Sequence, residues 1–235
     1  MKKSTLFSLI VIVVLIPATL LLGTRLPGRW YYLTSTLMIL ELMLPFFLSF
    51  ESRKPQAREL VTLAVMAALA AVSRVAFSFI PHFKPITAVI MITGIAFGPQ
   101  AGFLTGAVAA FASNFFFGQG PFTPWQMMAY GMGGFLAGIL FYKKGTLGLS
   151  QKKYTLVLTV FGYLSIQLFV GPLLDLCHIF TASSILSWEV AGAAFLSGLP
   201  VNTIHGSAAA LTMLLFSRPL LDKLERLQVK YGMME

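Results

Sequence analysis

The 235-residue chain contains 57% hydrophobic and only 11% charged residues, whereas soluble domains carry about 25% charged residues. This composition excludes a soluble globular protein, and the chain is long enough for seven or eight membrane crossings of about 20 residues each. The single cysteine, Cys177, excludes an internal disulfide and a cysteine-based metal cluster.

The order of the apolar segments predicts an all-α integral membrane protein. These segments fall at residues 5–23, 30–50, 59–80, 86–97, 101–117, 125–142, 154–176 and 189–216. The first has no small-residue cleavage site, so we interpret it as a retained helix rather than a signal peptide. With the N-terminus placed inside, thirteen of the seventeen Lys and Arg residues fall on the cytoplasmic side. The net charge of +9 therefore reflects topology, with both termini cytoplasmic, rather than nucleic-acid binding.

A charged segment, ESRKPQARE at residues 51–59, divides the chain. We interpret residues 1–52 as an N-terminal extension of two membrane helices and residues 58–217 as a six-helix core. Residues 218–235 form a basic amphipathic tail suited to the cytoplasmic membrane surface.

The segment at residues 86–97 is too short to cross a membrane, because 12 residues span about 18 Å. It either extends into its flanks or lies buried among neighbouring helices. Gly94, Gly98, Gly102 and Gly106 then recur at every fourth position around the sequence FGPQAG. This spacing predicts close approach of helices on both sides of that turn.

The first core helix carries two pairs of alanines at four-residue spacing, Ala64 with Ala68 and Ala67 with Ala71. Small residues in one stripe let a second helix approach closely. They either pack the protein's own helices or form a contact for a partner.

Arg74 lies late in the same helix. A charged side chain within a membrane span either faces protein or a water-filled cavity, or extends so that its charged end reaches the membrane interface. Arg74 is therefore either part of a cavity wall that contacts an amide or phosphate of a ligand, or a side chain directed toward the outer interface.

The connection NFFFGQGPFTPWQ, residues 114–126, is the strongest site candidate. Its two glycines and two prolines restrict it to particular backbone conformations. It contains several aromatic residues and no charge, which predicts a rigid loop with aromatic walls. Ser113 and Asn114 precede the loop and are expected to point into the same cavity.

Further polar residues flank the other outer connections. His82, Phe83 and Lys84 stand between two prolines in IPHFKP, which is either a loop over the ligand or a surface turn. Asp175 and His178 flank the last outer connection, and their spacing matches no metal-ligand pattern. Asn202 and His205 follow Pro200; they either satisfy the backbone at a kink or line a cavity floor.

The run SRVAFSFIPHFKPITAVIMITGIAFGPQAGFLTG, the loop and then MMAYGMGGFLAG resemble the S component of an energy-coupling-factor (ECF) vitamin transporter. The loop sequence is most similar to members specific for cobalamin or a corrinoid. This resemblance implies that the protein captures a vitamin at the outer face of a bacterial cell membrane. The implied binding residues are Arg74, His82, Phe83, Lys84, Asn114, Phe115, Phe117, Gln119, Phe122, Trp125, Gln126, Asp175, His178 and Asn202.

The resemblance also implies partners. In the family, alanines on the first core helix dock on a transmembrane T subunit, and two ATPase subunits use ATP to drive transport. Ala64, Ala67, Ala68 and Ala71 match that alanine motif in position. No cofactor or metal ion is expected on this chain, and its ligand is expected to be cobalamin or a corrinoid precursor.

Other functions remain as alternatives. Another vitamin or a queuosine-type base is the first of these. A secondary transporter requires coupling carboxylates within spans, and Glu41 is the only one deep in an apolar segment. An intramembrane hydrolase requires a paired serine and histidine, yet His205 and Ser207 lie two residues apart and face different directions on a helix. The chain lacks a P-loop motif, so we do not expect it to hydrolyse ATP itself. We interpret it as a transporter subunit and not as an enzyme.

Overall fold

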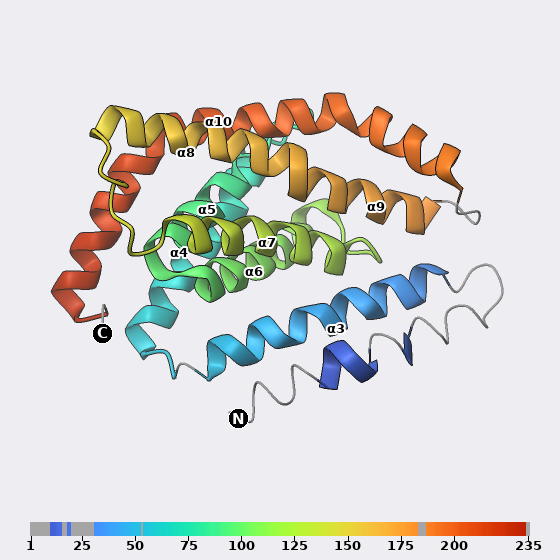
Figure 1. The fold of residues 1–235 in the computed structure, drawn as a ribbon, viewed down its shortest axis with the longest axis horizontal. Coiled ribbons are helices and arrows are strands. Elements are labelled where there is room, and N and C mark those ends of the chain that lie inside the picture. Colours follow the sequence, from blue (N-terminus) through green and yellow to red (C-terminus); the bar gives the residue numbers. More distant parts are fainter. Residues whose placement is uncertain (1–9, 16–17, 20–30, 53, 183–186, 234–235) are drawn as a thin grey trace.

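The structure is a computed structural model that describes residues 10–15, 18–19, 31–52, 54–182 and 187–233. Across these residues the regular structure is entirely helical, which confirms the all-α part of the predicted fold class (Figure 1). A short π-helix, η1, covers Val11–Leu15, and the rest of the first predicted helix lies largely outside the described residues. The later helices are α3 (Tyr31–Glu51), α4 (Ala57–Ala76), α5 (Ile86–Phe97), α6 (Pro99–Phe117), α7 (Thr123–Phe141), α8 (Gln151–Ser165), η3 (Ile166–Val170), α9 (Gly171–Ala182) and α10 (Trp188–Tyr231).

Within the described part of the chain, four helical stretches are long and apolar enough to cross a membrane. They are α4, α6, the continuous stretch Gln151–Phe180 and α10. One end of the bundle carries residues 77–85 and 118–122, and we call it the loop end. The opposite end, with residues 142–150 and 219–233, is the tail end.

Helix α5 lies at the centre of the bundle, and its apolar residues explain why. Eleven of its twelve residues are buried, as expected for a helix that is hydrophobic on every side. Helices α4, α6, α7 and α10 all pack on it. The predicted bounds of 86–97 are confirmed, and of the two possibilities left open the structure shows burial among neighbours.

Close contacts between glycines join α5, α6 and α7. A Cβ atom added at Gly94 or Gly102 would overlap the backbone of Gly134 on α7, and one at Gly106 would overlap Gly131. Gly98, between α5 and α6, has a φ of 95°, which favours glycine. The close helix approach predicted from the four-residue glycine spacing is therefore confirmed, and α7 supplies the facing backbone.

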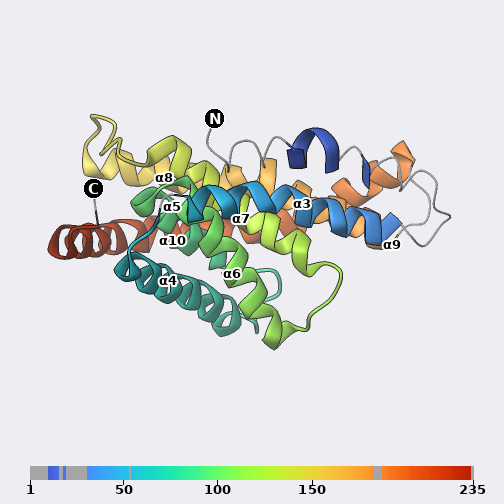
Figure 2. The same cartoon turned by 90° about the horizontal axis from the view of Figure 1, so that it is seen from below.

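Helix α3 packs on the bundle through aromatic rings. Phe46 stacks on Phe103 of α6 with ring centroids 4.1 Å apart and meets the edge of Phe135 of α7 at 4.9 Å. Figure 2 shows α3 lying along α7. The second helix of the N-terminal segment therefore shares a hydrophobic cluster with the core.

Helix α10 extends beyond the apolar segment that ends at residue 216 and continues to Tyr231. Its 44 residues span about 66 Å at 1.5 Å each, well beyond the ~30 Å of membrane hydrocarbon. It bends before its last turns (Figure 1) and contains Pro219, a cause of helix kinks. Beyond the bend, Leu224 is buried and Gln228 Nε2 donates to Ala96 O at 2.7 Å. The tail thus packs on the core.

Candidate functional site

A buried arginine links two helices at the loop end. Arg74, in the last turn of α4, is only 4% exposed. Its Nη1 donates to Ser113 Oγ at 2.6 Å and to Asn114 Oδ1 at 2.8 Å, both on α6. Its guanidinium carbon lies 4.5 Å from the ring centroid of Phe117. The side chain therefore lies inside the protein rather than at the membrane interface, and its contact with a ligand stays a prediction.

The same asparagine fixes the loop that follows α6. Asn114 Nδ2 donates to Thr123 Oγ1 at 3.1 Å and to Gln126 Oε1 at 2.9 Å, so it ties the end of α6 to the start of α7. Thr123 Oγ1 in turn donates to Gln119 Oε1 at 2.9 Å and accepts from the Gly120 N–H at 3.2 Å. These bonds hold both ends of the loop, which agrees with the predicted rigidity.

A second polar group lies next to Arg74 in the bundle. His205 Nε2 of α10 is 3.2 Å from Thr87 Oγ1 of α5, and both residues are buried. The ring of Tyr130 on α7 meets His205 edge-on at 6.0 Å and lies 6.0 Å from the Arg74 guanidinium carbon. Sequence analysis missed Tyr130 and Thr87; the available signal was a hydroxyl-bearing side chain within each of two mainly apolar helices.

Three buried donors of this region lack a hydrogen-bond partner among the described residues. They are Arg74 Nε, Tyr130 Oη and Trp125 Nε1. A buried polar group left without a partner costs about 1–3 kcal/mol, so such groups call for a ligand or water. Arg74 and Tyr130 are neighbours and could bind acceptor atoms of one ligand, such as carbonyl oxygens or ring nitrogens.

The aromatic residues of the loop do not gather into one wall. Trp125 is 5% exposed and stacks on Phe180 of α9 at 5.6 Å. Phe115 is 70% exposed, and Phe122 is half-buried. Trp125 therefore faces the cluster shared with α3 and α9, whereas Tyr130, five residues later, faces Arg74.

The other predicted site residues lie in the turn after α4 and on α9 and α10. In the turn after α4, His82 is exposed with a φ of 61°, while Phe83 and Lys84 are half-buried. Asp175 Oδ2 of α9 accepts from Asn202 Nδ2 of α10 at 2.9 Å. Asp175 and His178 lie within helix α9 rather than in a loop, and His178 is exposed.

The four alanines of α4 divide between two faces. Ala67 and Ala71 are buried in the protein's own core, whereas Ala64 and Ala68 are exposed. Val65 and Val72 on the exposed side are 61% and 60% accessible. Only Ala64 and Ala68 are thus open to a partner.

The geometry gives no serine–histidine pair in α10. Ser207 Oγ donates to the carbonyl of Thr203 at 2.8 Å, while His205 contacts Thr87 on α5. The hydroxyl and the imidazole therefore make separate contacts, as their spacing predicted.

Comparisons with known proteins identify a family. Residues 54–222 match the family model described as ECF-type riboflavin transporter, S component. The folate transporter FolT of Streptococcus mutans serotype c (strain ATCC 700610 / UA159) is 31% identical over 115 residues, which are 47% of this chain and 61% of that protein. The chain therefore spans about three fifths of the length of that curated relative. No solved structure matches the chain.

Proposed function

The chain belongs to the family of ECF-type riboflavin transporter S components, and we propose that it captures a vitamin with a flat heteroaromatic ring, of the riboflavin or folate type. Such a ring carries carbonyl oxygens and ring nitrogens along one edge and an apolar face on each side. It therefore suits a site that combines hydrogen-bond donors with aromatic rings.

The observation that carries this proposal is the pair of unpartnered donors on Arg74 and Tyr130. Ser113 and Asn114 hold the Arg74 guanidinium from one side through Nη1, which leaves Nε for a ligand. The ring of Phe117 covers the guanidinium. A ligand acceptor placed against Nε and the Tyr130 hydroxyl would satisfy both buried donors at once.

The sequence-based expectation of cobalamin or a corrinoid precursor gains no support from the comparisons. The family description names riboflavin, and the curated relative is a folate transporter. A compact polar centre around Arg74 also favours a small planar ring over a corrin macrocycle. The vitamin proposed here therefore replaces the corrinoid.

Transport would require partners that use ATP. We propose a transmembrane T subunit that docks on the exposed face of α4 at Ala64 and Ala68, together with two ATPase subunits. The protein would lie in a bacterial cell membrane with the loop end outside and both termini in the cytoplasm. The cations that cluster at the tail end support this orientation.

Direct binding tests the proposal. Purified protein in lipid nanodiscs is titrated with riboflavin, folate and cyanocobalamin, with riboflavin followed by its fluorescence and the others by calorimetry. We expect saturable one-to-one binding of riboflavin or folate and none of cyanocobalamin. Binding of cyanocobalamin alone would restore the corrinoid assignment, and binding of none of the three would remove the vitamin assignment.

A further inference from the structure

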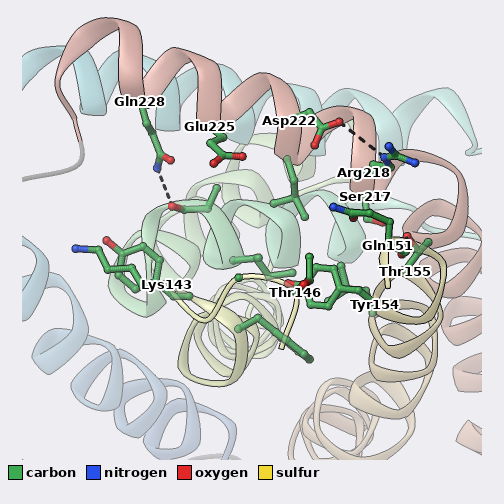
Figure 3. Close-up of a pocket in the computed structure, with 17 residues that line it drawn as sticks. Lys143, Thr146, Gln151, Tyr154, Thr155, Ser217, Arg218, Asp222, Glu225 and Gln228 are labelled. Atoms are coloured by element: carbon green, nitrogen blue, oxygen red, sulfur yellow. Dashed lines mark hydrogen bonds and ion pairs between the residues drawn. The ribbon is translucent and has the colours of Figure 1, made fainter. Parts of the chain in front are cut away.

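A cavity of about 390 Å³ opens at the tail end of the bundle (Figure 3). Arg74 lies at the other end, in the last turn of α4. It lies between the ends of α5 and α7, the start of α8 and the bent part of α10. Its polar lining includes Lys143, Thr146, Gln151, Thr155, Ser217, Arg218, Asp222 and Glu225. None of these residues belongs to the proposed vitamin site.

One side of the cavity presents hydrogen-bond donors and positive charge. The α8 helix begins there, and its N-cap residue, Ser150, makes no side-chain capping bond. The first turn holds Lys152 and Lys153 and no acidic residue. Cations near the positive end of a helix dipole are unfavourable by about 0.3–1 kcal/mol each, and a bound anion would offset this.

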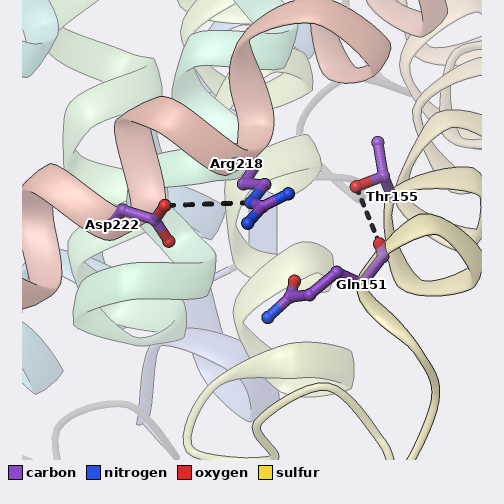
Figure 4. Close-up of polar contacts among 4 residues, drawn as sticks. All are labelled: Gln151, Thr155, Arg218 and Asp222. Carbon is purple, nitrogen blue, oxygen red and sulfur yellow. Dashed lines mark hydrogen bonds and ion pairs between the residues drawn. The ribbon is translucent and has the colours of Figure 1, made fainter.

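Two side chains extend this donor side. Figure 4 shows Gln151 reaching from α8 toward the space beside the guanidinium of Arg218 on α10. Thr155 Oγ1, one turn further along α8, donates to the Gln151 carbonyl at 3.0 Å and so anchors that turn. Arg218 and Gln151 can therefore bind one oxyanion from two helices.

An independent observation points to a ligand at this place. Ser217 of α10 lines the cavity and is fully buried, and its Oγ has no hydrogen-bond partner among the described residues. Elsewhere in α10, the hydroxyl groups of Ser207 and Thr212 each bond a carbonyl four residues earlier. The Ser217 hydroxyl makes no such bond and remains available to a ligand.

The bent part of α10 adds two carboxylates beside Arg218. Asp222 lies 3.9 Å from Arg218 Nε, a long contact between two exposed side chains that contributes little by itself. Glu225 lines the cavity one turn further along α10 (Figure 3). The cavity therefore presents donors from the α8 terminus and from Arg218 next to the carboxylates of Asp222 and Glu225.

We propose that this cavity binds a phosphoethanolamine group. Its phosphate would lie against the α8 N-terminus, Gln151, Arg218 and Ser217, and its ammonium against Glu225 and Asp222. A membrane phospholipid or a soluble phosphoethanolamine ester can supply this group. Near the cavity, α10 exposes Leu215 and Phe216, each more than half accessible, and these side chains would lie beside the acyl chains of a lipid.

The test uses the purified full-length protein, delipidated in detergent, and native mass spectrometry with defined lipids. We expect phosphatidylethanolamine to bind at least tenfold more tightly than phosphatidylcholine, whose methylated ammonium cannot donate hydrogen bonds to a carboxylate. Phosphatidylglycerol, which lacks the ammonium, should also bind more weakly. Competition by soluble phosphoethanolamine would identify a soluble source, and displacement only by the lipid would identify the membrane.

Three variants separate the two sides of the site. Arg218→Gln should weaken phosphatidylethanolamine binding at least tenfold, and Glu225→Gln should remove the preference over phosphatidylcholine. Lys223→Gln makes the same charge change as Arg218→Gln at an exposed position outside the cavity lining and should leave binding unchanged. Equal binding of all three lipids, or an equal loss in Lys223→Gln and Arg218→Gln, would overturn the proposal. Vitamin binding is measured on the same samples and should remain intact throughout.

Discussion

Arg74 of α4 and Asn114 of α6, forty residues apart in sequence, are joined by a hydrogen bond of 2.8 Å from Nη1 to Oδ1. The asparagine amide then donates to Thr123 and Gln126 on α7. The charged side chain of α4 is thus coupled, through Asn114, to the loop between α6 and α7. A ligand that engages Arg74 would meet a side chain whose position is already fixed, which lowers the entropic cost of binding.

We predict that Arg74→Gln weakens vitamin binding about 10- to 150-fold, because a hydrogen bond to a charged group contributes about 1.5–3 kcal/mol. Binding to nanodisc-embedded protein measures the effect. Arg58→Gln is the matched control, since Arg58 is an exposed cation at the other end of the same helix. Unchanged affinity in Arg74→Gln would move the site away from this centre.

We predict that Asn114→Leu lowers the free energy of unfolding by about 2–3 kcal/mol, because it leaves the buried Arg74 with one partner fewer. It also removes the bonds to Thr123 and Gln126, so the loop at residues 118–122 should become more sensitive to protease. Thermal unfolding and limited proteolysis in detergent are the measurements. Ser197→Ala, which removes an exposed polar side chain, should change neither. A stable, protease-resistant Asn114→Leu protein would show that the loop is held by other contacts.

Gly134→Ala should destabilise the protein by about 1–3 kcal/mol, as expected for added volume in a close-packed core. The new Cβ would lie 2.5 Å from the carbonyl oxygen of Gly102, so the backbones of α6 and α7 would have to separate. Gly192→Ala is the control, because a Cβ there meets no atom within 4 Å. Comparison of the two melting temperatures checks the prediction; equal values would contradict the glycine contact.

Ala68→Trp should prevent assembly with a T subunit and leave vitamin binding unchanged, because it adds bulk to the exposed face of α4. Ala193→Trp places the same side chain at an exposed alanine of α10 and should assemble normally. Co-purification of the transporter complex, with vitamin binding measured in parallel, gives the result. Normal assembly of Ala68→Trp would locate the partner contact elsewhere.

The fold class and much of the helix order could be predicted from the sequence because the signals are local. Twelve mainly apolar residues between Pro85 and Gly98 define α5 wherever it packs, and its bounds were predicted correctly. The glycines at four-residue spacing predicted a close helix contact for the same reason, since the spacing places them on one face. The amphipathic tail could also be predicted, but not its packing on the core, because the burial of Leu224 and the bond from Gln228 to Ala96 join residues distant in sequence.

The candidate site depended on contacts that no local pattern contains. Hydropathy could place Arg74 in a helix, yet only the packing of α4 on α6 brought Ser113 and Asn114 to its guanidinium. His205 and Thr87 are 118 residues apart, and Tyr130 joins them from a third helix. The sequence by itself determined that this is a helical membrane protein with a restrained aromatic loop, because composition and helix period act over a few residues. The tertiary structure decided which polar groups share one buried centre, because that depends on how helices distant in sequence pack together.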